Sequence, residues 1–221
     1  MEYPLDLGIS ARTADAVGNE ALVVSDPRSD LPNAKQEGEA TAEALRSMGF
    51  RVLTSQGAAV SHSTLASGLP QAAFFHYAGH AVLQGVDGFS GGFPLKNGSS
   101  FNVGDILSLP QVPRIAVVFG CEGARTAGGP VETLGIAQAF VMRGSLVAVA
   151  PQRVVDDKAS SRFATSFYAE LAKARARQSA SDGNSANSAN SGNEWARLVG
   201  LAVTAAKQGH PDASAFRVVV P

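Results

Sequence analysis

The chain has 221 residues, 45% of them hydrophobic and 17% charged, with a formal net charge of -1 at pH 7. This length predicts one domain, residues 1–221, with a sizeable core. The near-neutral net charge does not indicate the basic surface that nucleic-acid binding requires. No segment approaches the roughly 20 apolar residues of a membrane helix, and no basic, then apolar, N-terminal signal is evident. We therefore expect a cytoplasmic protein without nucleic-acid or membrane partners.

The first half of the chain alternates strands with helices. Short apolar runs predict strands at 21–24, 50–54, 73–79 and 115–120, and helical spacing predicts helices at 34–48, 61–69 and 103–109. Asn33 is the expected N-cap of the first helix, and Gly49 its stop. The glycine-rich stretch 85–98 predicts a flexible loop or a small hairpin. Strands separated by crossover helices are typical of a parallel sheet.

The second half continues the same alternation. We predict helices at 131–143, 160–177 and 194–208, and strands at 145–150 and 216–220. The segment 179–193 is rich in Ser, Asn, Ala and Gly, without apolar anchors, and predicts a disordered surface loop.

Two of the predicted strands end in a glycine followed by a chemically reactive side chain. Cys121, the only cysteine, follows the run IAVVFG, and His80 follows FFHYAG. The carboxyl ends of parallel strands are where function collects in α/β sheets, so the sulfur and the imidazole can meet there. A lone cysteine cannot form an internal disulfide or a multi-cysteine zinc site, and the alternative for Cys121 is a small buried hydrophobe.

Four segments, taken in order, resemble the CHAT family of caspase-like cysteine peptidases. They are FHYAGHA at 75–81, VVFGCE at 117–122, ETLGIAQAF at 132–140 and VVDD at 154–157. The segment FYAEL at 167–171 also resembles the family pattern. The resemblance implies an α/β fold of caspase-like type: a three-layer sandwich with a mostly parallel central sheet of about six strands and helices on both faces.

The resemblance also implies a cysteine endopeptidase that needs no cofactor or metal. His80 would be the general base and Cys121 the nucleophile, with the backbone N–H groups of Ala81 and Cys121 as the oxyanion hole. No third, orienting carboxylate is evident in the sequence. The implied partners are a specific protein substrate, such as a gasdermin-like pore former in bacterial defence, and a regulatory or sensor module.

Three acidic residues are predicted to bind substrate. Asp156 and Asp157 resemble the loop that binds a basic P1 side chain in separases, and Glu122 lies beside the nucleophile. The alternative for the aspartates is to cap the next helix, and for Glu122 to face solvent. Two other functions remain open: a catalytically silent protein-binding module on the same fold, and metal binding by His76 and His80, whose spacing suits one helix face.

Overall fold

The computed structural model describes residues 18–82, 91–120, 135–153, 155–181 and 192–221. The described strands are β1 (Glu20–Ser25), β2 (Arg51–Gln56), β3 (Phe74–Gly79), β4 (Gly92–Pro94), β5 (Ser100–Asn102), β6 (Ile115–Gly120), β7 (Val147–Pro151) and β8 (Phe216–Val219). The described α-helices are α1 (Pro32–Ser47), α2 (His62–Gly68), α3 (Val103–Ser108), α4 (Ile136–Arg143), α5 (Asp157–Ser181) and α6 (Gly192–Ala206). None of the helices in these ranges is long and apolar enough to cross a bilayer.

Six of the strands form one central sheet in the order β2-β1-β3-β6-β7-β8. Every neighbouring pair is parallel except β7 and β8, which are antiparallel. The predicted mostly parallel sheet is confirmed. The sequence did not predict that β8 runs antiparallel to β7. The glycine-rich stretch supplies β4 and β5, which pair as a separate antiparallel hairpin.

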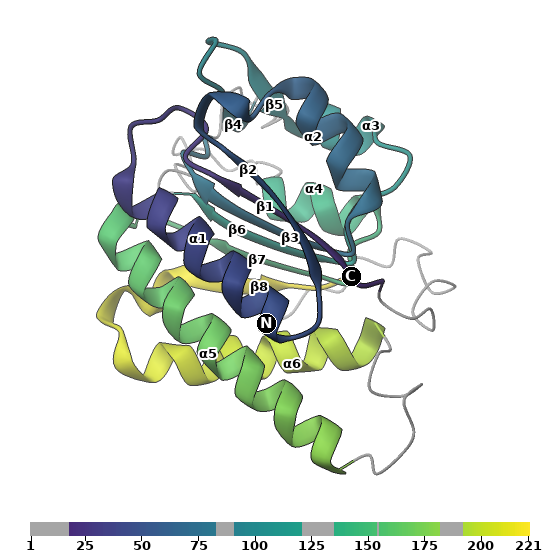
Figure 1. Ribbon diagram of the computed structural model, residues 1–221, viewed down its shortest axis with the longest axis vertical. Helices are drawn as coiled ribbons and strands as arrows, with labels where there is room; N and C mark the ends of the chain where they lie inside the picture. The colour runs from purple at the N-terminus through teal and green to yellow at the C-terminus, as the bar shows by residue number, and fades with distance from the viewer. Residues whose placement is uncertain (1–17, 83–90, 121–134, 154, 182–191) are drawn as a thin grey trace, which may run out of the picture.

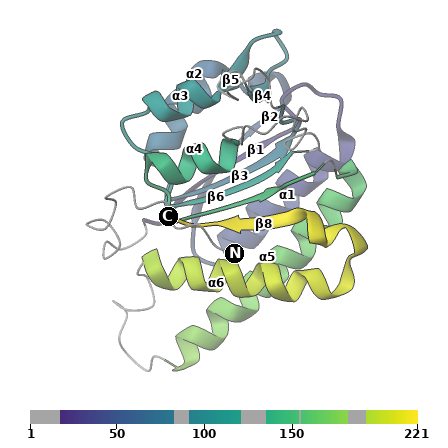
Figure 2. The same cartoon turned by 180° about the vertical axis from the view of Figure 1, so that it is seen from behind.

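Helices cover both faces of the sheet, so the molecule has three layers (Figure 1). Helices α1, α5 and α6 lie on one face, and α2, α3 and α4 lie on the other with the β4–β5 hairpin, as the view from behind also shows (Figure 2). The side chains of the sheet divide between two apolar clusters, one on each face. Strands β3 and β6 are buried along their whole length because both faces are covered. The predicted α/β sandwich is confirmed.

Two expectations about helix ends need correction. Helix α1 begins at Pro32, which suits the first turn because its missing N–H needs no partner there. Asn33 therefore lies inside the helix and does not cap it. At the other end of the chain, α5 extends to Ser181 and α6 begins at Gly192, so the predicted disordered loop at 179–193 is too long at both ends. Residues 182–191 lie outside the described part of the chain.

Candidate active site

Strands β3 and β6 lie side by side and end in register. Gly79, the last residue of β3, is the direct partner of Gly120, the last residue of β6. His80 and Cys121 are the residues that directly follow these two glycines in the sequence. Cys121 lies outside the described residues. The register supports the expected meeting of sulfur and imidazole, and the contact itself stays a prediction.

Ala81 lies directly over the end of β6. A β-carbon placed on Gly120 would be 2.4 Å from the Ala81 Cβ and 3.1 Å from the Ala81 nitrogen. Only glycine fits at this position, because real Cβ atoms do not approach other atoms so closely. The backbone N–H of Ala81, the predicted oxyanion donor, is thus held next to the residue that precedes Cys121.

The His80 side chain is about one-quarter exposed, and its ring contacts an acid that the sequence did not reveal. His80 Nε2 lies 3.1 Å from Asp30 Oδ1, with exposed side-chain fractions of 24% and 40%. Asp30 Oδ2 in turn lies 3.1 Å from Arg28 Nε. No orienting carboxylate was evident in the sequence, and the structure shows that Asp30 lies in contact with the ring. Because Nε2 faces Asp30, Nδ1 is the ring atom left to face a thiol.

Hydrogen bonds of Asp26 hold the loop that carries Asp30. Asp26 Oδ1 accepts hydrogen bonds from the N–H groups of Asp30 and Leu31, at 2.9 and 3.0 Å. The Asp26 N–H donates to the Ala78 carbonyl of β3 at 2.8 Å. Asp26 and Ser29 both adopt positive φ angles, 46° and 63°, which Asp tolerates better than most residues. The strand that precedes His80 thereby also holds the acid that faces it.

A second group of contacts holds the backbone of His80. The Tyr77 hydroxyl donates to the His80 carbonyl oxygen at 2.5 Å. The Tyr77 ring stacks on Phe93 of β4, with ring centroids 4.0 Å apart. His80 is therefore anchored to the β4–β5 hairpin through its main chain and to the β1–α1 loop through its ring.

Both of the aspartates predicted to bind substrate make hydrogen bonds at the start of α5. Asp156 Oδ1 accepts from the N–H groups of Lys158 and Ala159, at 3.0 and 3.2 Å, which is the helix-capping alternative. Asp157 Oδ2 accepts from Asn33 through its N–H, at 3.3 Å, and its Nδ2, at 2.7 Å. These bonds engage one oxygen of each carboxylate, and substrate binding stays a prediction. Glu122 lies outside the described residues.

A cluster of three fully buried polar side chains lies beneath this edge, between the sheet and two helices. The Tyr168 hydroxyl of α5 and His76 Nδ1 of β3 are hydrogen-bonded, 2.9 Å apart. Glu37 Oε1 of α1 lies 3.1 Å from His76 Nε2, but off the line that an aligned hydrogen bond requires, so neither atom has a hydrogen-bond partner among the described residues. We refer to these three residues as the buried cluster.

Burial disfavours the charged form of each member of the buried cluster. It lowers the pKa of His76 to about 3, because the imidazolium would lose its hydration. The pKa of Glu37 is raised well above its ordinary value, first by burial and then by the negative charge of Asp157. Burial, and then Glu37, also raise the pKa of Tyr168.

The metal hypothesis for His76 and His80 required a helix, and the structure places His76 on a strand. Residues four apart along an extended chain are separated by about 13 Å, so the two rings do not converge on one ion. Each ring instead faces a different acid, Glu37 or Asp30. Within the described ranges, we find no group of three or more His, Cys, Asp and Glu side chains arranged to hold a metal.

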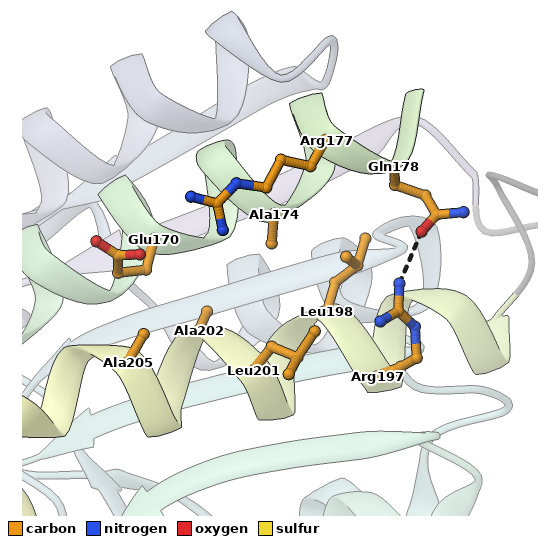
Figure 3. A pocket seen from close by; sticks show the side chains of 9 residues that line it. All are labelled: Glu170, Ala174, Arg177, Gln178, Arg197, Leu198, Leu201, Ala202 and Ala205. Atoms are coloured by element: carbon orange, nitrogen blue, oxygen red, sulfur yellow. Dashed lines mark hydrogen bonds between the residues drawn. The ribbon is translucent and has the colours of Figure 1, made fainter. Parts of the chain in front are cut away.

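A cavity of about 450 Å³ lies between α5 and α6, away from His80 (Figure 3). Its walls combine small and apolar side chains with Glu170, Arg177 and Arg197. The Arg197 guanidinium donates to Gln178 Oε1 at 2.7 Å across its end. The residues that line this cavity include no histidine, cysteine or hydroxyl side chain, so it holds no pair of a thiol or hydroxyl with an imidazole.

Sequence reasoning missed Asp30 and the partners of His76. The position of Asp30, after a parallel strand and before its crossover helix, was the available signal, because such loops meet at the carboxyl edge of the sheet. Glu37 and Tyr168 gave no comparable signal, since each lies in an ordinary helical pattern whose burial depends on the packing of three elements.

Comparison with known proteins agrees with the fold. The chain is similar to separase from Saccharomyces cerevisiae, in its complex with securin, with 15% identity, a TM-score of 0.57 and coverage of 91% of this chain and 12% of separase. It is also similar to the Arg-specific cysteine proteinase gingipain R, with 13% identity, a TM-score of 0.61 and coverage of 94% of this chain and 47% of gingipain. At these identities the likeness establishes the fold alone.

The chain spans less than half of either of those proteins. No curated protein matches the sequence. The sequence pattern of the CHAT domain matches residues 5–195, well over half of the chain. The protein described here, with its caspase-like fold, therefore belongs to the CHAT domain family.

Proposed function

We propose that this domain is a cysteine endopeptidase in which Cys121 and His80 form the catalytic dyad. The observation that supports the proposal most strongly is the register of Gly79 with Gly120, because His80 and Cys121 directly follow these two paired glycines in the sequence. The membership of the CHAT family and the likeness to two cysteine peptidase folds point in the same direction.

In the proposed reaction, His80 Nδ1 takes the proton of the Cys121 thiol, and the thiolate attacks the peptide carbonyl carbon. The N–H groups of Ala81 and Cys121 donate to the oxyanion that forms. The C–N bond then breaks as the imidazolium gives its proton to the leaving amine. Water, deprotonated by the same imidazole, hydrolyses the thioester and releases the acid product.

Asp30 has the orienting role in this scheme. Its carboxylate lies 3.1 Å from His80 Nε2 and accepts that N–H, which fixes the ring tautomer with a lone pair on Nδ1. The same carboxylate stabilises the imidazolium that forms after the thiol loses its proton. Because the pair is partly exposed, its electrostatic contribution is modest, and orientation is its main effect.

The substrate class we propose is a specific partner protein with a basic residue at the cleavage position. Asp156 and Asp157 each keep one carboxylate oxygen outside the hydrogen bonds described above. An oxygen of this kind can accept from a guanidinium or ammonium group. A gasdermin-like pore former and a protein of a neighbouring regulatory module are the first substrates to test.

The decisive experiment compares the wild type with Cys121→Ala and His80→Ala on the same candidate proteins. We expect cleavage by the wild type and none by either variant, with the folded state of each variant checked by circular dichroism. Equal cleavage by all three proteins would overturn the proposed dyad. No cleavage by the wild type, combined with tight binding of a partner protein, would favour the catalytically silent binding module.

A further inference from the structure

We propose that Glu37 and His76 are positioning residues, whose buried contact holds helix α1, and with it Asp30, beside His80. The inference rests on the proposed function for its catalytic consequence, but its structural part is tested independently of activity. It assigns a role to the buried cluster, which the proposed reaction does not use directly.

The first step of the argument is the location of the buried cluster. Its members come from three elements: Glu37 from α1, His76 from β3 and Tyr168 from α5. The His76 side chain is fully buried, and that of Glu37 is 2% exposed. Polar groups buried to this extent are costly unless they are paired, so the contact between α1 and β3 depends on the state of Glu37 and His76.

The second step is the connection from α1 to His80. Glu37 lies in the first half of α1, about two turns after Asp30, and only Leu31 separates Asp30 from the start of the helix. A displacement of α1 therefore moves the loop that carries Asp30. The N–H groups of Asp30 and Leu31, both bonded to Asp26 Oδ1, report on the position of this loop.

The third step is the packing between α1 and α5, which leaves α1 room to move. A cavity of about 210 Å³ lies between these helices, beside Glu37 and Tyr168. Most of its other walls are small side chains: Ala40, Thr41, Ala44, Ala164, Thr165, Ala169 and Ala172. The bond between Asn33 and Asp157 joins the same two helices at their first turns. The contact between α1 and α5 beside Glu37 is therefore made of small side chains and this polar bond.

The final step is the response to pH. The titratable groups that face Glu37 are His76 of β3, and Tyr168 and Asp157 of α5. None of them is a cation at neutral pH, because burial holds the pKa of His76 at about 3. Loss of the Glu37 proton at high pH places a carboxylate among neutral and negative groups, and hydration of that carboxylate through the neighbouring cavity displaces α1.

The test uses hydrogen exchange of the whole chain from about pH 6 to about pH 10, with protection factors corrected for the intrinsic pH dependence. In the wild type, protection of the Asp30 and Leu31 amides should fall about tenfold across this range relative to the Val117 amide of β6. Glu37→Gln keeps a group that can donate to or accept from His76 Nε2 but does not ionise, and should retain protection throughout. Glu37→Ala should lose it at every pH.

Thr41→Val is the matched control, because Thr41 is buried at the same junction and carries no titratable group. It should follow the wild-type profile. A parallel fall of protection in the wild type and Glu37→Gln would overturn the proposal, and so would a flat profile in both.

The second readout is the pH profile of kcat/KM on a cleaved substrate. Glu37→Gln should extend activity to higher pH than the wild type, which a purely structural role of Glu37 does not predict. Absence of cleavage that depends on Cys121 would refute the proposed function alone, because the exchange experiment still judges the positioning role.

Discussion

The Ala81 side chain occupies the space that a side chain at Gly120 would need. Gly120 ends β6, and Ala81 follows the end of the neighbouring strand β3 by two residues, so the contact lies where the two paired strands end. This relationship makes the geometry of the candidate active site sensitive to a single methyl group.

Gly120→Ala should therefore damage both stability and activity. The added methyl would lie 2.4 Å from the Ala81 Cβ, so β3 and β6 must shift at their ends. We expect a loss of about 1–3 kcal/mol in the free energy of unfolding, measured by urea denaturation, and a loss of proteolysis. Gly200→Ala is the control: nothing lies within 4 Å of its added Cβ, and the free energy of unfolding should rise by about 0.5–1 kcal/mol. Equal behaviour of the two variants would contradict this.

Asp30→Asn should reduce kcat with little change in KM. The amide preserves the shape of the side chain but loses the charge that stabilises the imidazolium of His80, 3.1 Å away. We expect a loss of about tenfold in kcat, less than for a fully buried orienting acid, because the pair is partly exposed. Glu43→Gln, an exposed carboxylate on α1, is the control. Unchanged kcat in Asp30→Asn would show that the charge of Asp30 does not contribute to the reaction.

Two substitutions of Asp156 distinguish its role in helix capping from a role in substrate binding. Asp156→Asn retains a good N-cap and should leave stability nearly unchanged, whereas Asp156→Ala should cost about 1 kcal/mol of unfolding free energy. If the charge also binds a basic cleavage-site residue, Asp156→Asn will raise KM for Arg substrates but not for matched Leu substrates. An equal KM in wild type and Asp156→Asn would leave capping as the sole role of this side chain.

His76 should make the protein sensitive to acid. Burial lowers its pKa from 6.5 to about 3, so the unfolded chain binds a proton in this range that the folded protein does not. Stability from this group is complete above about pH 6.5 and is lost as the pH falls toward 3, by about 1.4 kcal/mol per pH unit. His76→Asn should show a correspondingly smaller acid slope in denaturation experiments. Identical slopes would show that His76 is protonated in the folded state.

The sequence predicted the fold most reliably for strands that are buried along their whole length. Strands β3 and β6 are continuous apolar runs ended by glycine, and such runs indicate central parallel strands whatever their neighbours are. Their order along the chain, with crossover helices between them, was enough to predict a parallel sheet. Adjacency of β3 to β6 needed the three-dimensional structure, because β4, β5 and α3 intervene in the sequence.

Contacts between distant polar residues were not predictable in the same way. Asn33 and Asp157 are 124 positions apart, and each has an ordinary local interpretation as a helix-capping residue. Glu37 lies in the polar stretch KQEGE, typical of a solvent-facing turn, yet it is buried against His76. In both cases the pairing depends on how α1 and α5 cross the sheet, which no periodicity within either helix encodes.

The end-to-end register of β3 with β6 has a practical consequence for protein engineering. Strand pairing, rather than any loop, sets where β3 and β6 end, so foreign loops can be grafted beyond Ala81 without altering the ends of these strands. Recognition of new sequences by the proposed dyad can then be selected on an unchanged sheet.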